Sequence, residues 1–177
     1  MDTGNGRVSA LALFVSATCA GMALAQSAPS RSFDELRQSV AQAQADAALQ
    51  VRLRWHIARP TANPALTENR VELVAVESTP GSVRRDRAPQ VGSTSLVAVS
   101  RDNAGRELDW RAFADPRVVR AEASGGAELT GERLYYLETD LLLHVPDLPD
   151  TTQIDLYSVR AENGRAVLDS LGTVGVR

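Results

Sequence analysis

The densest group of chemically competent side chains lies in the segment YYLETDLLLHVPDLPD, residues 135–150. Glu138, Asp140 and His144 supply carboxylates and an imidazole, which are groups that bind metal ions or transfer protons. A site of either kind requires the groups to converge on one point. Whether they can do so depends on the element that carries them.

Apolar and polar residues alternate from residue 134 to residue 145, which predicts a β-strand. The core face of this strand carries Tyr135, Leu137, Thr139, Leu141, Leu143 and Val145. The opposite face carries Tyr136, Glu138, Asp140, Leu142 and His144. A strand rises ~3.3 Å per residue, so Asp140 and His144 lie ~13 Å apart, and Glu138 and His144 ~20 Å apart. Zinc ligands approach the metal to ~2.0–2.3 Å, so we predict a solvent-facing strand here and no metal site.

A second strand with the same alternation is predicted at residues 49–57, LQVRLRWHI. Its polar face carries Gln50, Arg52, Arg54 and His56. If the two strands are neighbours, we expect ion pairs across them. Arg52, Arg54 and His56 would pair with Glu138 and Asp140. Such charges also protect a sheet against edge-to-edge aggregation. A metal site shared by His56 and His144 is the alternative, and we favour the solvent-facing interpretation.

Two further features are suited to ligand binding. Arg84, Arg85 and Arg87 form a basic loop with Asp86, which could meet phosphate or an acidic glycan. A solvated loop with Arg–Asp pairing is favoured, because no aromatic residues interleave with the arginines. Tyr136 points outward on its strand, where it could stack on a sugar or a protein partner.

Sequence motifs of the familiar catalytic classes are missing from the chain. It contains no HExxH zinc motif, no P-loop, no GxGxxG and no GxSxG nucleophile elbow. We therefore predict a non-catalytic protein without a cofactor, and a hydrolase of unfamiliar type is the enzymatic alternative. The net charge of −3 argues against nucleic acid as a partner.

Residues 1–25 are typical of a signal peptide. Arg7 precedes an apolar run that ends at Ala23-Leu24-Ala25, which predicts cleavage before Gln26. The chain is then exported, and we expect it in the periplasm, with secretion as an alternative. Membrane anchoring by an uncleaved signal, or by a lipid on Cys19, is a second alternative. After cleavage no cysteine and no membrane span remain.

The mature chain is predicted to be one domain preceded by a short helix. Residues 26–47 contain a linker and an amphipathic helix, in which Ser32 and Glu35 form a capping box. The apolar side of this helix packs either on the domain or on a partner. Residues 48–177 contain seven or eight strands with no helices between them, which favours an all-β, immunoglobulin-like antiparallel β-sandwich.

Four segments of the chain, LRWHI, VELVAVES, SLVAVSRDNAGRELDWRAF and VPDLP, follow one another in an order known from another family. From Ala48 to Arg177 the chain resembles the accessory β-sandwich domain of secreted IgA-peptidase-like metallopeptidases. The resemblance implies a stand-alone immunoglobulin-like module. Because the catalytic zinc motif of that family is missing here, no activity and no site residue carries over.

Taken together, the sequence predicts an exported binding module of the cell envelope. Its partner is expected to be a protein, recognised by an exposed strand edge or by the charged sheet face. Binding of a glycan or another envelope ligand through Tyr136 and the Arg84–Arg87 loop is the second hypothesis. A hydrolase is the third.

Overall fold

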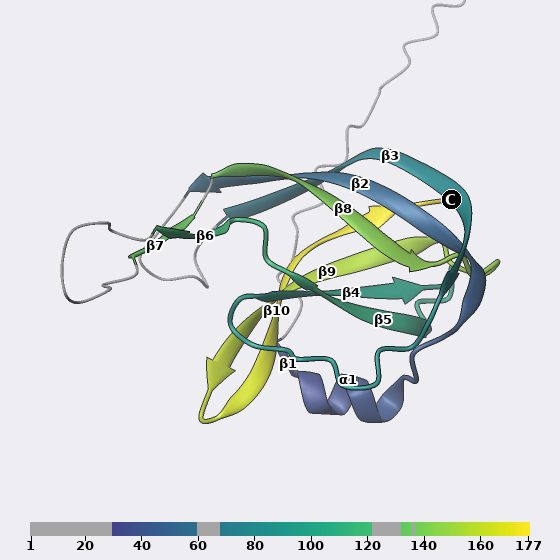
Figure 1. Ribbon diagram of the computed structural model, residues 1–177, viewed down its shortest axis with the longest axis horizontal. Coiled ribbons are helices and arrows are strands. Elements are labelled where there is room, and N and C mark those ends of the chain that lie inside the picture. The colour runs from purple at the N-terminus through teal and green to yellow at the C-terminus, as the bar shows by residue number, and fades with distance from the viewer. Residues whose placement is uncertain (1–29, 60–67, 122–131, 136) are drawn as a thin grey trace, which may run out of the picture.

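The computed structural model describes residues 30–59, 68–121, 132–135 and 137–177 (Figure 1). Its elements in chain order are β1 (Arg31–Ser32), α1 (Phe33–Ser39), β2 (Ala45–Arg59), β3 (Glu68–Val83), β4 (Ser95–Arg101), β5 (Glu107–Ala114), β6 (Val118–Ala121), β7 (Glu132–Tyr135), β8 (Glu138–Pro146), β9 (Gln153–Glu162) and β10 (Arg165–Gly175). The predicted signal peptide, residues 1–25, and Tyr136 lie outside the described residues.

Two antiparallel sheets form the body of the molecule. One has five strands in the order β1-β10-β9-β4-β5, and the other has three in the order β3-β2-β8. A separate two-stranded ribbon, β6-β7, extends from one end (Figure 1). The predicted all-β sandwich with a short N-terminal helix is therefore confirmed.

The core between the two sheets is built from the inward-facing residues of both. On the three-stranded sheet it includes Val51, Leu53 and Trp55 of β2, of which none is exposed. On the five-stranded sheet it includes Leu96 and Ile154. Side chains alternate between the two faces of a strand, so the period-two pattern of β2 and β8 places their charged residues outside this core.

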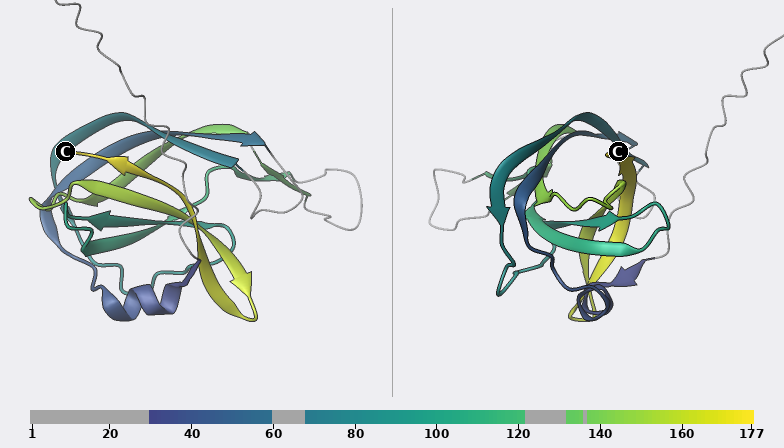
Figure 2. Two further views of the ribbon diagram at one scale, coloured as in Figure 1. Left: turned by 180° about the vertical axis from the view of Figure 1, so that it is seen from behind. Right: turned by 90° about the vertical axis from the view of Figure 1, so that its right-hand side faces the viewer.

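Helix α1 covers the other face of the five-stranded sheet, so three layers are stacked, as Figure 2 shows from two further directions. Phe33, Leu36 and Val40 pack on side chains of that sheet, and the Phe33 ring meets Trp110 edge-on at 5.1 Å between centroids. The helix therefore packs on its own domain, and the capping box of Ser32 and Glu35 is present. Among the described residues no helix is long and apolar enough to cross a membrane.

The predicted helix at 32–47 is too long, because α1 ends at Ser39 and β2 begins at Ala45. The backbone between them bonds to strand β5 instead of continuing the helix. Trp110 Nε1 donates to the Val40 carbonyl at 2.9 Å, and the Ala43 amide donates to Asp109 at 2.7 Å. The alanines beyond Val40 offer little apolar area to bury, so these bonds determine where the helix ends.

The predicted strand at 134–145 is also interrupted. Residues up to Tyr135 belong to β7 and pair with β6, whereas β8 begins at Glu138 and pairs with β2. Leu137 lies at the break and is 53% exposed, so its assignment to the core face is wrong. From Leu141 onward the predicted core face is confirmed, since Leu141, Leu143 and Val145 are all buried.

Candidate functional site

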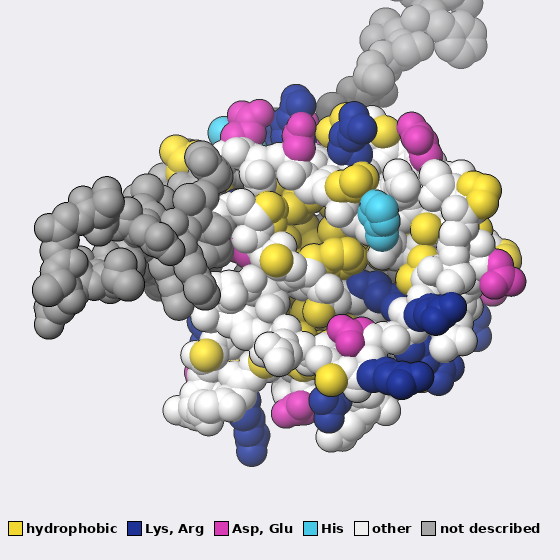
Figure 3. Space-filling model, in the orientation of Figure 1, with side chains coloured by type: hydrophobic (Ala, Val, Ile, Leu, Met, Phe, Trp, Pro, Cys, Tyr) yellow, Lys and Arg dark blue, Asp and Glu magenta, His cyan; other side chains and the backbone are white. Residues whose placement is uncertain are grey.

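The outer face of the three-stranded sheet carries the charged residues singled out in the sequence. Strand β2 pairs with β8 so that Arg52 lies opposite Leu142, Arg54 opposite Asp140, and His56 opposite Glu138. All six of these side chains are exposed. Acidic and basic side chains alternate along this part of the surface in Figure 3. No layer of the described structure covers this face.

The expected cross-strand ion pairs are present for Arg54, whereas Arg52 lies opposite Leu142. Arg54 Nε lies 3.2 Å from an Asp140 oxygen and 3.6 Å from a Glu138 oxygen, and His56 Nδ1 lies 3.8 Å from Glu138. The side chains of Arg54, Glu138 and Asp140 are 49% to 59% exposed. Exposed pairs of this kind contribute ~0–1 kcal/mol, so a binding partner can rearrange them at little cost.

The two histidines do not meet. His56 lies opposite Glu138, whereas His144 lies opposite Gln50, six residues away along β2. That separation is ~20 Å along the strand, which is far beyond the span of two ligands of one metal ion. Within the described ranges, no three side chains of the ligating types are grouped around a common point.

The acidic residues at the end of the opening segment have a structural role. Asp147 accepts hydrogen bonds from the Ser78 hydroxyl and from Arg177, which ties the end of β8 to β3 and to the C-terminus. The hydrogen bond from Ser78, followed by that from Arg177, holds the pKa of Asp147 below its usual value. Asp150 is exposed in the turn that follows.

The basic loop lies at the opposite end of the three-stranded sheet from His56. Val83, the last residue of β3, pairs with Ala45 at the beginning of β2. Arg84, Arg85 and Arg87 are exposed, and the Arg84 carbonyl accepts a hydrogen bond from Arg111 Nη1 at 2.6 Å. The structure therefore does not bring the loop and the charged face together.

A buried ion pair on β5 was missed by sequence reasoning. Arg111 Nε donates to Asp109 at 2.9 Å, and the same guanidinium donates to the carbonyls of Ala43 and Arg84. Burial raises the pKa of Asp109 despite the opposing effect of Arg111. Besides bonding to each other, the two side chains hold the backbone of Ala43 and Arg84, which marks the pair as structural.

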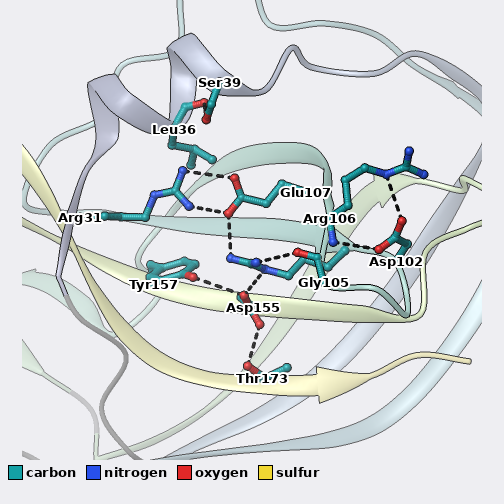
Figure 4. A network of polar contacts seen from close by, with 11 residues as sticks. Arg31, Leu36, Ser39, Asp102, Gly105, Arg106, Glu107, Asp155, Tyr157 and Thr173 are labelled. Carbon is teal, nitrogen blue, oxygen red and sulfur yellow. Dashed lines mark hydrogen bonds and ion pairs between the residues drawn. The ribbon is translucent and has the colours of Figure 1, made fainter.

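A second polar network, drawn in Figure 4, connects β1, β4, β5, β9 and β10. Glu107 accepts from Arg31 at 3.2 Å and from Arg101 at 2.7 Å, while Arg101 Nε lies 2.6 Å from Asp155. Asp155 also accepts from Thr173 at 2.6 Å, and from Tyr157, whose pKa is raised by burial and then by this carboxylate. Both carboxylates are neutralised by arginines, so the network fixes β1 on the sheet and offers no general base.

The edges of the two main sheets differ in how they are protected. Strand β1 has only two residues, and on β5 the side chains of Asp109 and Arg111 hold the backbone of Ala43 beside the strand. Strand β3 has register shifts against β2 and carries Pro80. It also packs on β10, where a Cβ added to Gly172 would lie 3.6 Å from the Val71 side chain. Bulges, proline and short length are the devices by which natural sheets prevent unwanted pairing.

Strand β8 has no bulge and no internal proline, and the charges of Glu138 and Asp140 are the protective device that it carries. It runs beside β2 for nine residues without a register shift, and its proline, Pro146, is its last residue. It approaches β5 at one side of the sandwich without pairing with it. Within the part of the chain that the structure describes, no strand pairs with the second edge of β8.

The hydrogen bonds at the two ends of the β2–β8 ladder show which groups lie on that second edge. The amide of Asp147 donates to Ala47, and the amide of Ile57 donates to Leu137, so these two residue pairs are hydrogen-bonded pairs. Bonded and non-bonded pairs alternate in an antiparallel ladder, so odd-numbered residues of β8 bond to β2. The even-numbered residues therefore direct their backbone groups away from β2. Pro146 occupies such a position, where its missing N–H breaks no bond of the ladder.

No protein-family model matches this chain, and no curated protein or solved structure is significantly similar to it. The resemblance to the accessory domain of IgA-peptidase-like metallopeptidases stays a prediction. Function must therefore be argued from the surface of the molecule itself.

Proposed function

We propose that the chain is an exported, non-catalytic interaction module that binds a protein partner along the second edge of β8. The observation that carries the proposal is the row of outward-directed backbone groups on Asp140, Leu142 and His144, with which no described strand pairs. An extended segment of another protein can bond to such a row as an additional strand.

The side chains along this edge support a protein as the partner. Leu142 is 53% exposed in the middle of the strand, where a partner strand could cover it. Charged groups flank it on both sides along β8, at Asp140 and His144. An edge with an apolar centre and polar ends provides affinity through the backbone and selectivity through alternate side chains.

The backbone N–H of His144 can be removed to test whether the β8 edge binds the partner, without disturbing the fold. His144 directs its N–H away from β2, so His144→Pro removes one outward donor while all bonds to β2 remain. His144→Ala removes the same side chain and keeps the donor, which makes it the matched control.

The full chain would be tagged at its C-terminus, expressed with its leader and crosslinked in the envelope before recovery. We expect the wild type and His144→Ala to recover a stoichiometric protein partner, a second untagged copy of this chain included, and His144→Pro to lose it. Equal recovery by His144→Pro and His144→Ala would show that the β8 edge is not the binding element.

A further inference from the structure

We infer that the partner of the β8 edge is a second copy of this chain, paired antiparallel through β8 with the two-fold axis at Leu142. The inference rests on the proposed function and names its partner. It follows from the order of side chains on the outer face of β8, which is Glu138, Asp140, Leu142 and His144.

Two copies of one strand that pair antiparallel are related by a two-fold axis, which closes the assembly as a dimer. Because the even-numbered residues carry the outward backbone groups, they form the bonded pairs between the copies. An axis at Leu142 places the two copies of Leu142 opposite each other. The same axis places Asp140 of each copy opposite His144 of the other.

This arrangement satisfies most of the exposed groups of the edge; only Pro146, which faces Glu138, has no N–H to donate. The two leucines, each 53% exposed in the single chain, cover one another. Arg54 Nε already donates to one oxygen of Asp140 at 3.2 Å, and a carboxylate has further acceptor capacity for an imidazole N–H of His144. Opposite polar groups at directly facing positions of a sheet stabilise the pairing.

Other positions of the axis fit less well. An axis at Asp140 places two carboxylates opposite each other, which is unfavourable for a strand pair. An axis at Leu141 pairs Glu138 with His144 but leaves Asp140 facing Leu142. The axis at Leu142 is the one that matches both the apolar and the polar positions.

The first test compares two substitutions at one exposed position. His144→Arg keeps a side chain that donates to Asp140. His144→Asp instead places a carboxylate opposite Asp140 of the other copy, and the two-fold axis repeats this repulsive pair at a second place in the dimer. Sedimentation velocity of the full chain over a range of concentrations would measure the dimerisation constant of each.

We expect a concentration-dependent dimer for the wild type and for His144→Arg, and at least about tenfold weaker association for His144→Asp. One strand from each copy makes a small interface, so the association is expected in the micromolar range. A wild type that stays monomeric at several hundred micromolar, or a His144→Asp variant that dimerises as well as the wild type, would overturn the inference.

The second test determines which residues of the two β8 strands face each other in the dimer. In a Cys19→Ser background, Leu142→Cys places two thiols at the axis, where facing Cα atoms are ~5.5 Å apart, which is within the range of a disulfide. His144→Cys in the same background places its two thiols ~13 Å apart along the strands. We expect mild oxidation to crosslink the first variant and not the second, and the reverse result would contradict the register.

The two proposals fail in different ways. A monomeric wild type whose His144→Pro variant loses a different protein would refute self-pairing and leave the β8 edge as the binding element. A monomeric wild type whose His144→Pro variant recovers the same partner as His144→Ala would refute both.

Discussion

The outer faces of the two main sheets differ: α1 covers that of the five-stranded sheet, whereas no described element covers that of the three-stranded sheet. On the five-stranded sheet, Asp155 and Tyr157 lie near α1 and are buried among arginines and hydroxyl groups that satisfy them. On the three-stranded sheet, Asp140 and Leu142 are exposed, with no described part of the chain over them. The first face is covered by the chain's own N-terminal helix, whereas no described part of the chain covers the second.

This difference extends to the sheet edges. On β5 a buried ion pair holds neighbouring backbone in place, while the edge of β8 offers a regular row of backbone groups. The same residue types therefore have different consequences in the two regions. Charges on the covered face determine stability, and charges on the uncovered face are available for recognition. Substitutions matched between the two regions test this division.

The largest effect is expected at the buried ion pair. Arg111→Met leaves Asp109 buried without its cation, which should lower the free energy of unfolding by about 3–5 kcal/mol in denaturant titrations. Asp109→Asn added to this variant removes the stranded charge, keeps an acceptor for the Ala43 amide, and should restore part of the loss. Arg54→Met on the uncovered face should cost at most ~1 kcal/mol. Equal costs for the two arginine substitutions would erase the distinction between the buried and the exposed charges.

The next effect compares two leucines. Leu36 is completely buried between α1 and the five-stranded sheet, so Leu36→Ala should cost about 2–5 kcal/mol through lost burial and a cavity. Leu142→Ala should change the stability of the single chain by less than about 0.5 kcal/mol, because the side chain is exposed. Thermal or chemical unfolding of both variants at low protein concentration measures the contrast. A large loss from Leu142→Ala would mean that part of the chain covers it.

The smallest effect concerns Asp147, at the end of β8. Its hydrogen bonds from Ser78 and Arg177 hold its pKa in the folded state below its value in the unfolded chain. The stabilisation is therefore present above the unfolded pKa of ~3.9 and is lost as pH falls through the folded pKa. Asp147→Asn should cost about 1 kcal/mol at neutral pH, and its stability should depend less on pH below ~4 than that of the wild type. Parallel pH profiles for the two proteins would show that the carboxylate does not stabilise the fold.

Much of the sandwich could be predicted because alternation determines which face of a strand a residue occupies. The core positions Trp55, Leu141 and Leu143 and the exposed positions Arg54 and Asp140 follow directly from it. The capping box at Ser32 likewise predicts where α1 begins. These features depend only on residues that are near one another in the chain.

The rest depends on contacts between distant segments, which local patterns do not contain. Asp109 and Arg111 look like surface residues in RELDWRAF, and only the approach of residues 42–44 and of Arg84 buries them. The end of α1 at Ser39 has the same origin. Alternation predicts which side chains lie on each face of β8, but it does not predict which strands pair with β8. The open edge of β8 follows only from the strand order.

Amide hydrogen exchange along β8, followed by NMR in dilute protein, tests the central claim most directly. If the second edge of β8 is open, the amides of Asp140, Leu142 and His144 exchange at nearly the rate of an unstructured chain, whereas those of Leu141, Leu143 and Val145 are protected by their bonds to β2. Raising the protein concentration should then protect the even-numbered amides as well. Equal protection of both sets in the dilute protein would contradict an open edge.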